Sequence, residues 1–475
     1  MADKTKLAVI AAIVIVAAAA AYLFLAHRGA PAATATAPAT EAGQTTASTN
    51  SSASIVNADS LDDCEGDNVV VVVYAEGQEK LAEKIASLLQ QQLAGHVPQG
   101  TVFCTAPAGS SGLADARVLP LILVKASNTS AKLEQLLLNE TIVDGYRPIR
   151  YDVDAVFAVQ VAARFGLPKP VYNAEAEAVI VEPQAAVARL EPEQLQAQRQ
   201  LLELVEAVFA AKITRVTAAD TVEGFSRDTR PGLVLRSSVD LTDGDPAVAR
   251  IGDNLYEARE IDFARVFMQR GLVEAIEYEK SADELDLVEA AERHPAIGSG
   301  PVHVAVFEDF MCPFCAKFYN ETLPWLEQQA ARGVLTLHFM DLIVHQQGVV
   351  PKLHRLLLCY FIETHDAEGY VDAVKEIYRL LLVDLEKLQK EEINETALLK
   401  DYDMLYEKLR EKLGIDENCT EAPKLITEST RIAQKLGLTG TPSFAAWREG
   451  GNYVIVTEGF RTQQFFEKLL DSLKG

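Results

Sequence analysis

Apolar and polar residues alternate along the chain in blocks that predict strands and helices in turn. Residues 69–74 form a continuous apolar run of strand length, and apolar residues then recur at helical spacing over 78–93. Buried strands that alternate with amphipathic helices are typical of layered α/β folds. Further strands are predicted at 101–104, 119–124, 179–182, 213–217, 233–236, 247–251, 302–307, 443–447 and 453–457. Further helices are predicted at 152–165, 192–210, 261–269 and 464–473.

The order β-α-β, followed by β-β-α, recurs three times along the chain. A Gly-aromatic-Arg step precedes the last helix of the first and third repeats, as Gly145-Tyr146-Arg147 and Gly459-Phe460-Arg461. A repeat of about 110 residues is a repeat of whole modules. We therefore predict three tandem α/β modules at 67–168, 169–290 and 295–475. One such domain behind an unrelated α/β region is the alternative.

The N-terminus carries an uninterrupted apolar run over residues 7–26, rich in Ala, Val and Ile. About 20 such residues span the hydrocarbon core of a membrane as a helix. Lys4 and Lys6 favour a cytoplasmic N-terminus, although Arg28 on the far side weakens this signal. We predict a single-pass anchor in the cell membrane, with the bulk of the chain outside the cytoplasm. A cleaved signal peptide ending near 30–32 is the alternative, and it leads to the same side.

Between the predicted anchor, residues 1–28, and the first module lies a segment of different composition, residues 29–66. Most of it is Ala, Thr, Ser, Pro and Gly, without apolar periodicity. Such a composition cannot bury enough apolar surface to order the chain. We predict a disordered linker here.

Asparagine usage supports an external location independently. Six of the eleven asparagines stand in Asn-X-Ser/Thr sequons, whereas chance would give about one or two. This excess predicts a glycosylated outer face, with candidate sites at Asn50, Asn128, Asn139, Asn320, Asn394 and Asn418.

The net charge of the chain bears on its partners. At −24 the surface repels the phosphates of nucleic acids and of anionic lipids. We therefore expect no nucleic-acid partner.

Two of the six cysteines form a Cys-X-X-Cys pair, Cys312-Pro313-Phe314-Cys315, between an apolar strand and an amphipathic helix. A thiol at a helix N-terminus faces unpaired N–H groups and the positive end of the helix dipole, which stabilise its thiolate. Pro313 suits the first turn, where its missing N–H would be unpaired anyway. The pattern predicts Cys312 as an exposed nucleophile and Cys315 as the thiol that resolves a mixed disulfide.

Half of a zinc site and a purely structural disulfide are the alternatives for this pair. A closed zinc site needs four ligands. The sequence has no second Cys-X-X-Cys, and ligand spacing is absent from His303, His338, His345 and His354. We predict redox chemistry with no metal and no cofactor.

Two segments carry a resemblance to a known family. The block 308–315, Glu-Asp-Phe-Met-Cys-Pro-Phe-Cys, resembles the active site of the DsbA-like thioredoxin family. The block 437–444, Gly-Leu-Thr-Gly-Thr-Pro-Ser-Phe, resembles the family's cis-proline loop. The likeness covers about 295–475, with a helical insertion over about 345–436. It implies a catalytic thioredoxin-like domain here and thioredoxin-like folds for the two modules without Cys-X-X-Cys.

The resemblance also implies roles for single residues. Cys312 is similar to the family's nucleophile, Cys315 to its resolving thiol, and Pro442 to the cis-proline that faces them. Thr441 would offer backbone hydrogen bonds to the substrate chain, as in strand addition. Glu308 resembles the acid beside the buried cysteine and would accept its proton, a solvated acid at the strand end being the alternative.

One departure from the family concerns Phe314, which stands where strong oxidants often carry His. Phe cannot donate to a thiolate, so we expect Cys312 to be less acidic than in those oxidants and its disulfide less oxidising. Met311 and Phe314 give the thiol an apolar flank, which suits the binding of unfolded chains.

The other four cysteines are expected to form structural disulfides. Cys359 and Cys419 both fall in the insertion, where similar family members pair cysteines, and a bond would close a loop of about 60 residues worth about 4 kcal/mol. Two buried free thiols are the alternative. Cys64 precedes the first strand and Cys104 ends the second, so adjacency in a parallel sheet predicts a second bond.

The sequence as a whole predicts a membrane-anchored, extracytoplasmic thiol–disulfide oxidoreductase, with oxidase or isomerase activity favoured over reductase activity. Its expected partners are exported proteins with cysteines and a membrane redox partner that resets the Cys-X-X-Cys. A structural or chaperone-like surface protein is one alternative, and a reductant dedicated to one client is the other.

Overall fold

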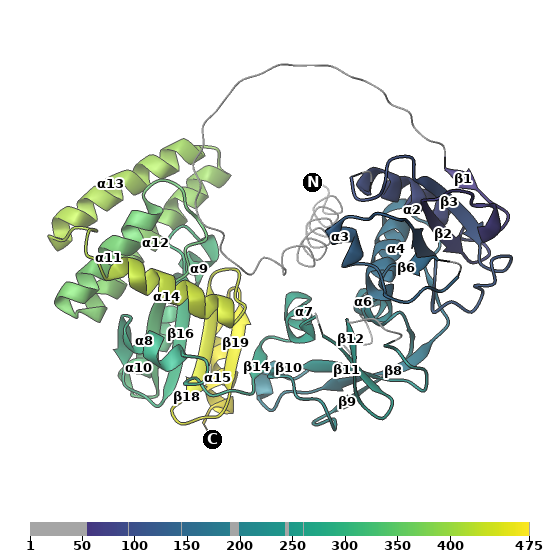
Figure 1. The fold of residues 1–475 in the computed structure, drawn as a ribbon. Helices are drawn as coiled ribbons and strands as arrows, with labels where there is room; N and C mark the ends of the chain where they lie inside the picture. The colour runs from purple at the N-terminus through teal and green to yellow at the C-terminus, as the bar shows by residue number, and fades with distance from the viewer. Residues whose placement is uncertain are drawn as a thin grey trace, which may run out of the picture. The chain divides into compact units, whose positions relative to one another are not determined.

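The computed structural model of the chain describes residues 55–474, except 94, 144, 191–198, 243–246 and 260 (Figure 1). The predicted anchor over 7–26 lies outside the described residues. Within the described ranges, no helix has the length and apolar character needed to cross a membrane. The described chain forms two compact units, the first holding 55–175 and 203–212 and the second holding the rest.

The first unit is built around one mixed sheet with strand order β1-β3-β2-β5-β6, in which β2 is parallel to β3 and antiparallel to β5. Its elements are β1 (Val56–Asn57), η1 (Leu61–Asp63), β2 (Val69–Tyr74), α2 (Glu79–Gln92), β3 (Val102–Pro107), β4 (Val118–Leu119), β5 (Leu121–Lys125), α3 (Ala131–Glu134), β6 (Arg147–Pro148), α4 (Tyr151–Phe165) and β7 (Val171–Tyr172). The unit also contains most of α6 (Arg199–Phe209).

Strand β2 shows why its sequence is apolar without interruption. Successive side chains of a strand point to opposite faces. Val69, Val71 and Val73 enter one apolar cluster, and Val70 and Val72 enter another on the opposite face. All five valines are fully buried. A sheet covered on both faces demands this continuous apolar run, as the sequence predicted.

Residues 56–64 lie within the segment predicted to be a disordered linker, but they form a strand, a turn and a disulfide, which corrects the linker's end. Strand β1 pairs in parallel with β3, with Val56 opposite Cys104. The η1 turn follows, and a disulfide joins Cys64 to Cys104. Cys64 lies after β1 and not in a neighbouring strand of the sheet. Because these contacts are all with distant residues, local composition gave no sign of them.

A buried carboxyl in the first unit leads to a prediction. Asp154 of α4 accepts a hydrogen bond from the Ile122 N–H at 2.7 Å through Oδ2, while Oδ1 is buried without a partner. Burial raises the pKa of Asp154 from 3.8 to about 8, and the bond from Ile122 offsets only part of this rise. The folded unit therefore binds a proton that the unfolded chain releases above its ordinary pKa.

We expect Asp154→Asn to flatten the pH dependence of this unit's stability. In the wild type, stability is fully present below about pH 4 and is lost as pH rises towards about 8, by on the order of 6 kcal/mol at about 1.4 kcal/mol per pKa unit. Asn keeps an oxygen for the Ile122 N–H but does not ionise. Hydrogen-exchange protection of β5 in the full chain, measured at pH 5 and pH 8, tests this. The matched control is Glu140→Gln at an exposed position, and an unchanged pH slope in Asp154→Asn would refute the assignment.

The second unit contains two sheets. A five-stranded sheet has the order β12-β13-β11-β8-β9, and a seven-stranded sheet has the order β10-β14-β19-β18-β16-β17-β15. The strands of the first are β8 (Glu175–Val181), β9 (Lys212–Ala219), β11 (Gly232–Arg236), β12 (Val248–Gly252) and β13 (Leu255–Ala258). Those of the second are β10 (Thr229–Arg230), β14 (Ile276–Tyr278), β15 (Ala296–Gly298), β16 (Val302–Glu308), β17 (Leu335–Asp341), β18 (Ser443–Arg448) and β19 (Val454–Glu458).

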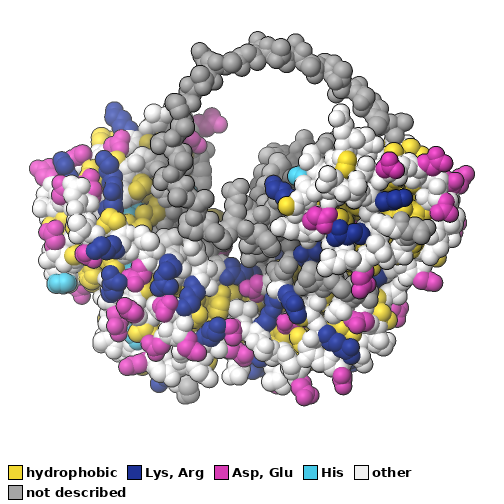
Figure 2. Space-filling view, in the orientation of Figure 1, with side chains coloured by type: hydrophobic (Ala, Val, Ile, Leu, Met, Phe, Trp, Pro, Cys, Tyr) yellow, Lys and Arg dark blue, Asp and Glu magenta, His cyan; other side chains and the backbone are white. Residues whose placement is uncertain are grey.

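The helices of the second unit cover the seven-stranded sheet and extend beyond it. They are η2 (Ala186–Ala188), α7 (Phe263–Gln269), α8 (Leu287–Glu292), α9 (Pro313–Glu321), α10 (Leu323–Ala331), α11 (Val350–Thr364), α12 (Ala367–Gln389), α13 (Glu395–Leu413), α14 (Ala422–Lys435) and α15 (Gln463–Ser472). Helices α11, α12 and α13 gather beyond one end of the sheet, and together with α14 they make up the predicted insertion (Figure 1). Figure 2 shows acidic and basic side chains interspersed over the visible face, without one dominant acidic patch.

The α/β prediction is confirmed, while the division into three modules stays a prediction. Each of the three large sheets has a cis X-Pro bond directly before a strand that lies in antiparallel contact with its neighbours, at Leu119–Pro120, Arg230–Pro231 and Thr441–Pro442. Strands β10 and β14 fall within the range predicted for the second module, yet they extend the sheet that holds Cys-X-X-Cys. Both are short. Strand β14 is placed by pairing with the distant β19, as between Ile276 and Val456, and β10 is placed by pairing with β14.

Candidate active site

The two cysteines of the predicted redox centre lie where β16 meets α9. Cys312 is the N-cap of α9, and Pro313 stands in the first turn, as its missing N–H allows. Cys315 lies one turn on, in the buried face of the helix. Both are free thiols, with 4% of Cys312 and none of Cys315 exposed. The prediction of an openly exposed nucleophile is corrected, because the loop before Pro442 covers the thiol.

The pKa values of the two thiols are shifted in opposite directions. The pKa of Cys312 is lowered to about 6, and its hydrogen bond with Cys315 is the largest cause. Burial acts in the opposite direction and raises this pKa. Hydrogen bonds with Thr441 and with the backbone N–H groups of Cys315 and Phe314 lower it further. Burial raises the pKa of Cys315 well above its ordinary value, and the bond with Cys312 adds to this rise. A thiolate forms at Cys312 at neutral pH, while Cys315 keeps its proton.

The proline loop faces the nucleophile. The Thr441–Pro442 bond is cis, and the Sγ of Cys312 donates to the Thr441 carbonyl oxygen at 3.1 Å. Ser443 Oγ donates to the Gly440 carbonyl at 2.6 Å and fixes the loop where it enters β18. The structure thus brings Cys312 to the backbone atoms that the resemblance assigned to substrate binding.

Glu308 ends β16 beneath the thiols and is fully buried, which excludes the reading of a solvated acid at the strand end. Tyr319 donates to one carboxyl oxygen at 3.0 Å and Tyr378 to the other at 3.1 Å. Burial raises the pKa of Glu308 well above its usual range, and these two hydrogen bonds offset only part of the rise. A buried carboxyl of this kind can hold or pass on a proton near Cys315 at neutral pH.

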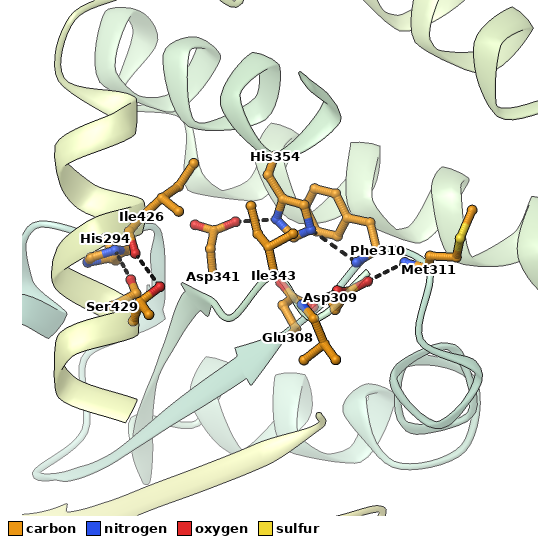
Figure 3. A network of polar contacts seen from close by, with 12 residues as sticks. His294, Glu308, Asp309, Phe310, Met311, Asp341, Ile343, His354, Ile426 and Ser429 are labelled. Atoms are coloured by element: carbon orange, nitrogen blue, oxygen red, sulfur yellow. Dashed lines mark hydrogen bonds and ion pairs between the residues drawn. The ribbon is translucent and has the colours of Figure 1, made fainter. Parts of the chain in front are cut away.

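The loop between β16 and Cys312 is held by groups that the sequence analysis did not select. Asp309 is fully buried and accepts a hydrogen bond from the backbone N–H of Met311 at 2.8 Å (Figure 3). It also accepts from the backbone N–H groups of Val344 at 2.6 Å and His345 at 2.7 Å. These bonds join the active-site loop to the segment after β17. Asp309 stands next to Glu308 in the sequence. Two adjacent acids at the end of an apolar strand were the signal from which a role for Asp309 could have been predicted.

His354 of α11 holds the same loop from the insertion. Its Nε2 accepts from the Phe310 N–H at 3.1 Å, and its Nδ1 contacts Asp341, so the proton sits on Nδ1 (Figure 3). The His354 ring stacks on Phe310 with centroids 3.7 Å apart. His354 was dismissed from the sequence because it had no ligand spacing, and its role is to position backbone.

Two tyrosines of the inserted helices complete this support. The Tyr378 hydroxyl of α12 lies 3.1 Å from the Asp309 carbonyl as well as from Glu308, so its one proton is shared between them. Tyr402 of α13 donates to the Phe310 carbonyl at 2.7 Å. Each buried backbone group left without a partner would cost about 1–3 kcal/mol. The insertion therefore fixes the geometry of the loop that carries Cys312.

The surroundings of the thiols differ in exposure. Phe314 is 59% exposed and Pro313 is exposed, while Met311 is half-buried. In the described part of the chain, no group of three or more His, Cys, Asp or Glu residues is placed to hold a metal ion.

The four remaining cysteines form two disulfide bonds, Cys64–Cys104 and Cys359–Cys419, the pairs named in the sequence analysis. The second bond ties α11 to the segment before α14 and so braces the helix that carries His354. Of the candidate glycosylation sites, Asn50 lies outside the described residues. The other five are all exposed: Asn128, Asn139, Asn320, Asn394 and Asn418.

Comparison with known proteins adds to this geometry. Residues 292–449 match the family model described as thioredoxin. Cys-X-X-Cys at a helix N-terminus, a cis-proline opposite it and a helical insertion are the features that this domain shares with the DsbA-like thioredoxin family. The resemblance seen in the sequence is thereby confirmed for this domain.

Solved structures and curated proteins were also compared. The chain is similar to Wolbachia pipientis alpha-DsbA1, with 19% identity over 38% of this chain and 89% of that one and a TM-score of 0.28. It is similar to the catalytic domain of Proteus mirabilis ScsC, with 18% identity over 40% and 96% and a TM-score of 0.30. For Pseudomonas aeruginosa DsbA2 the values are 16%, 38%, 92% and 0.27. No curated protein matches the chain.

Proposed function

We propose that this chain forms or isomerises disulfide bonds in exported proteins, outside the cytoplasm and anchored in the cell membrane through residues 7–26. The observation that carries the proposal is the contrast between the two thiols of the redox centre. Cys312 is acidic and faces a cis-proline loop, whereas Cys315 is fully buried and holds its proton.

The exchange proceeds through a mixed disulfide. A client thiolate attacks Sγ of Cys312 in the disulfide form, the Cys312–Cys315 bond breaks, and Cys315 leaves as a thiolate that takes up a proton. A second client thiolate then attacks the client sulfur bound to Cys312 and expels the Cys312 thiolate. The client loses two electrons and the Cys312–Cys315 pair gains them. Isomerisation begins instead with attack of the Cys312 thiolate on a client disulfide, which frees one client thiolate. A different client thiolate then attacks the mixed disulfide and expels the Cys312 thiolate, with no net change of oxidation state. Where no client thiolate does so, Cys315 attacks Sγ of Cys312, and the client leaves with its thiol reduced.

The acidity of Cys312 favours the oxidising direction. A thiol with a pKa of about 6 is a good leaving group and stabilises the reduced form of the pair. Phe314 supplies no hydrogen bond from its side chain, so the low pKa rests on Cys315, Thr441 and backbone N–H groups. We therefore favour oxidase or isomerase activity for the Cys312–Cys315 pair over reductase activity.

The surroundings of the thiol support a protein client. Phe314 offers an exposed apolar side chain beside Cys312, and the Thr441 backbone offers an edge for strand addition. Because only 4% of Cys312 is exposed, a client strand must come close to both groups to reach its sulfur.

The proposed location draws on features away from the centre. Two disulfides remote from Cys-X-X-Cys are typical of an oxidising compartment, and the five described sequons are exposed. The apolar run 7–26 would place the domain near a membrane redox partner, which would return the reduced pair to its disulfide form.

Redox titration of the full chain tests the proposed direction. Cys312 and Cys315 would be followed by differential alkylation and mass spectrometry across a glutathione series. We expect a midpoint near about −120 to −200 mV, the range of oxidases and isomerases, and one near about −270 mV would reassign the pair as a reductant. The Cys312→Ser variant controls for alkylation elsewhere. If Cys312 resists alkylation at every poise in the native chain, the catalytic proposal fails.

A further inference from the structure

The first unit repeats, without a thiol, the arrangement around Cys312. Gln78 is the N-cap of α2 directly after strand β2, and the cis bond Leu119–Pro120 precedes β5. Gln78 Nε2 donates to the Leu119 carbonyl at 3.2 Å, as Cys312 Sγ donates to the Thr441 carbonyl at 3.1 Å. Gln78 is 2% exposed. It takes the place of the nucleophile, and its amide side chain cannot exchange disulfides.

The backbone edge beside this cis-proline carries a bound strand. Strand β7 runs antiparallel to β4, with Val171 opposite Leu119 and Tyr172 opposite Val118. The Asn173 N–H continues the pairing by donating to the Arg117 carbonyl at 3.1 Å. An extended segment of the chain therefore lies on the edge where strand addition would place a peptide.

Side chains recognise this segment at both ends. At one end, Gln78 Nε2 donates a second hydrogen bond to the Lys169 carbonyl at 2.8 Å. At the other end, Asn173 Nδ2 donates to the carbonyls of Ala114 at 3.0 Å and Ala116 at 2.7 Å.

The side chains between these ends are partly enclosed. Pro170 is buried, and the Tyr172 ring packs against the apolar core of the unit. Lys169 forms an ion pair with Glu203 of α6. The Val171 side chain between them is exposed, so the unit contacts side chains on both sides of it but not Val171 itself.

The corresponding edge of the catalytic domain differs. In the ranges that the structure describes, no strand pairs with residues 439–441, and the Thr441 carbonyl contacts Cys312. The cis-proline edge of the first unit is thus covered by strand β7 of the same chain, whereas no strand pairs with the cis-proline edge beside Cys312 in the described residues.

We propose that the first unit is a non-catalytic peptide-binding module, whose cis-proline edge binds an extended segment of the type basic-Pro-X-aromatic-Asn. Its occupant is the chain's own Lys169-Pro170-Val171-Tyr172-Asn173. A tethered strand competes at an effective concentration on the order of millimolar, so an external peptide reaches the edge only when this strand is released. The site needs no cysteine in its ligand, because Gln78 replaces the thiol.

A competition experiment on the full chain tests the proposal. The probe is a fluorescent peptide with the sequence of residues 167–173, and the variant is Tyr172→Ala/Asn173→Ala, which weakens the tethered strand but leaves the edge intact. We expect the variant to bind the probe at least about 10-fold more tightly than the wild type. Adding Gln78→Ala should reverse the gain, whereas Gln91→Ala, an exposed change on the same helix, should not. A probe carrying Ala at both changed positions should bind neither chain.

Two results would overturn the proposal. One is a variant that keeps its circular dichroism and its Cys64–Cys104 bond yet gains no affinity for the probe. The other is rapid, unprotected hydrogen exchange at the amide of Asn173 in the wild type, a measurement that does not depend on any variant folding. Alkylation of Cys312 should be equal in all these chains, so failure here is distinguishable from failure of the proposed redox function.

Discussion

Replacing Cys315 with alanine is expected to leave clients joined to Cys312 as mixed disulfides. In the wild type, Cys315 lies one helical turn from Cys312 and attacks the mixed disulfide within the same molecule. Effective molarities of about 10⁵ M or more for well-placed groups make such attack far faster than attack by external thiols. We expect the lifetime of the adducts to rise at least about 100-fold.

The adducts are measured by acid quenching, non-reducing electrophoresis and mass spectrometry of the peptide that contains Cys312. The double variant Cys312→Ala/Cys315→Ala is the control, since it has no nucleophile at this pair. Because Cys315 is fully buried, we expect it to react only with Cys312 and not with clients directly. Its loss should therefore not alter which clients are captured. An absence of adducts on Cys312, with the protein folded, would contradict exchange at this pair.

The second large effect is expected for Glu308→Gln, which should slow release of the mixed disulfide by about 10²-fold or more. Cys315 must lose a proton to attack, and burial raises its pKa, so attack depends on a nearby proton acceptor. Glu308 is the buried carboxyl that we assign as this acceptor, and it can take the proton only when it is ionised. Its negative charge also raises the pKa of Cys315. Glutamine has nearly the same shape and can keep an acceptor for one tyrosine, but it cannot take the proton.

The measurement separates the two steps of exchange. Single-turnover release from a preformed mixed disulfide should slow and lose its dependence on the Glu308 ionisation, while alkylation of Cys312 keeps its inflection near pH 6. Stability gives a further check. Because the folded pKa of Glu308 is raised, the wild type loses stability as pH rises above the ordinary carboxyl pKa, and Glu308→Gln should remove that loss. Equal release rates in both proteins would exclude Glu308 as the acceptor.

The inserted helices have a specific role in this account. They carry His354, Tyr378 and Tyr402, which hold the backbone of the loop before Cys312. The Cys359–Cys419 bond ties the first of these helices to the chain that returns to the cis-proline loop. The two halves of the active site are therefore joined through the insertion as well as through the sheet.

The redox pair could be predicted from the sequence because its signals are local. The apolar run 302–307, the Cys-X-X-Cys and the helical spacing after it lie within about 20 residues, and Pro313 suits only a first turn. The cis-proline loop could likewise be predicted from the residues of the 437–444 block alone. Strand β2 was predicted for the same reason, because a strand buried on both faces has to be apolar at every position.

Burial and long-range pairing were decided only by the tertiary structure. Whether Glu308 was solvated or buried depended on Tyr319, Tyr378 and the layers above the strand. Strands β10 and β14 and the bound strand β7 are two or three residues long, too short for any periodicity, and they exist because a distant edge supplies their hydrogen bonds.

The sequence by itself determined that a thiol pair starts a helix after a buried strand, since propensity and apolar spacing act between neighbours. The tertiary structure alone decided how acidic each thiol is and what holds its loop. Those properties depend on desolvation and hydrogen bonds from residues as far away as Thr441, which no local pattern encodes.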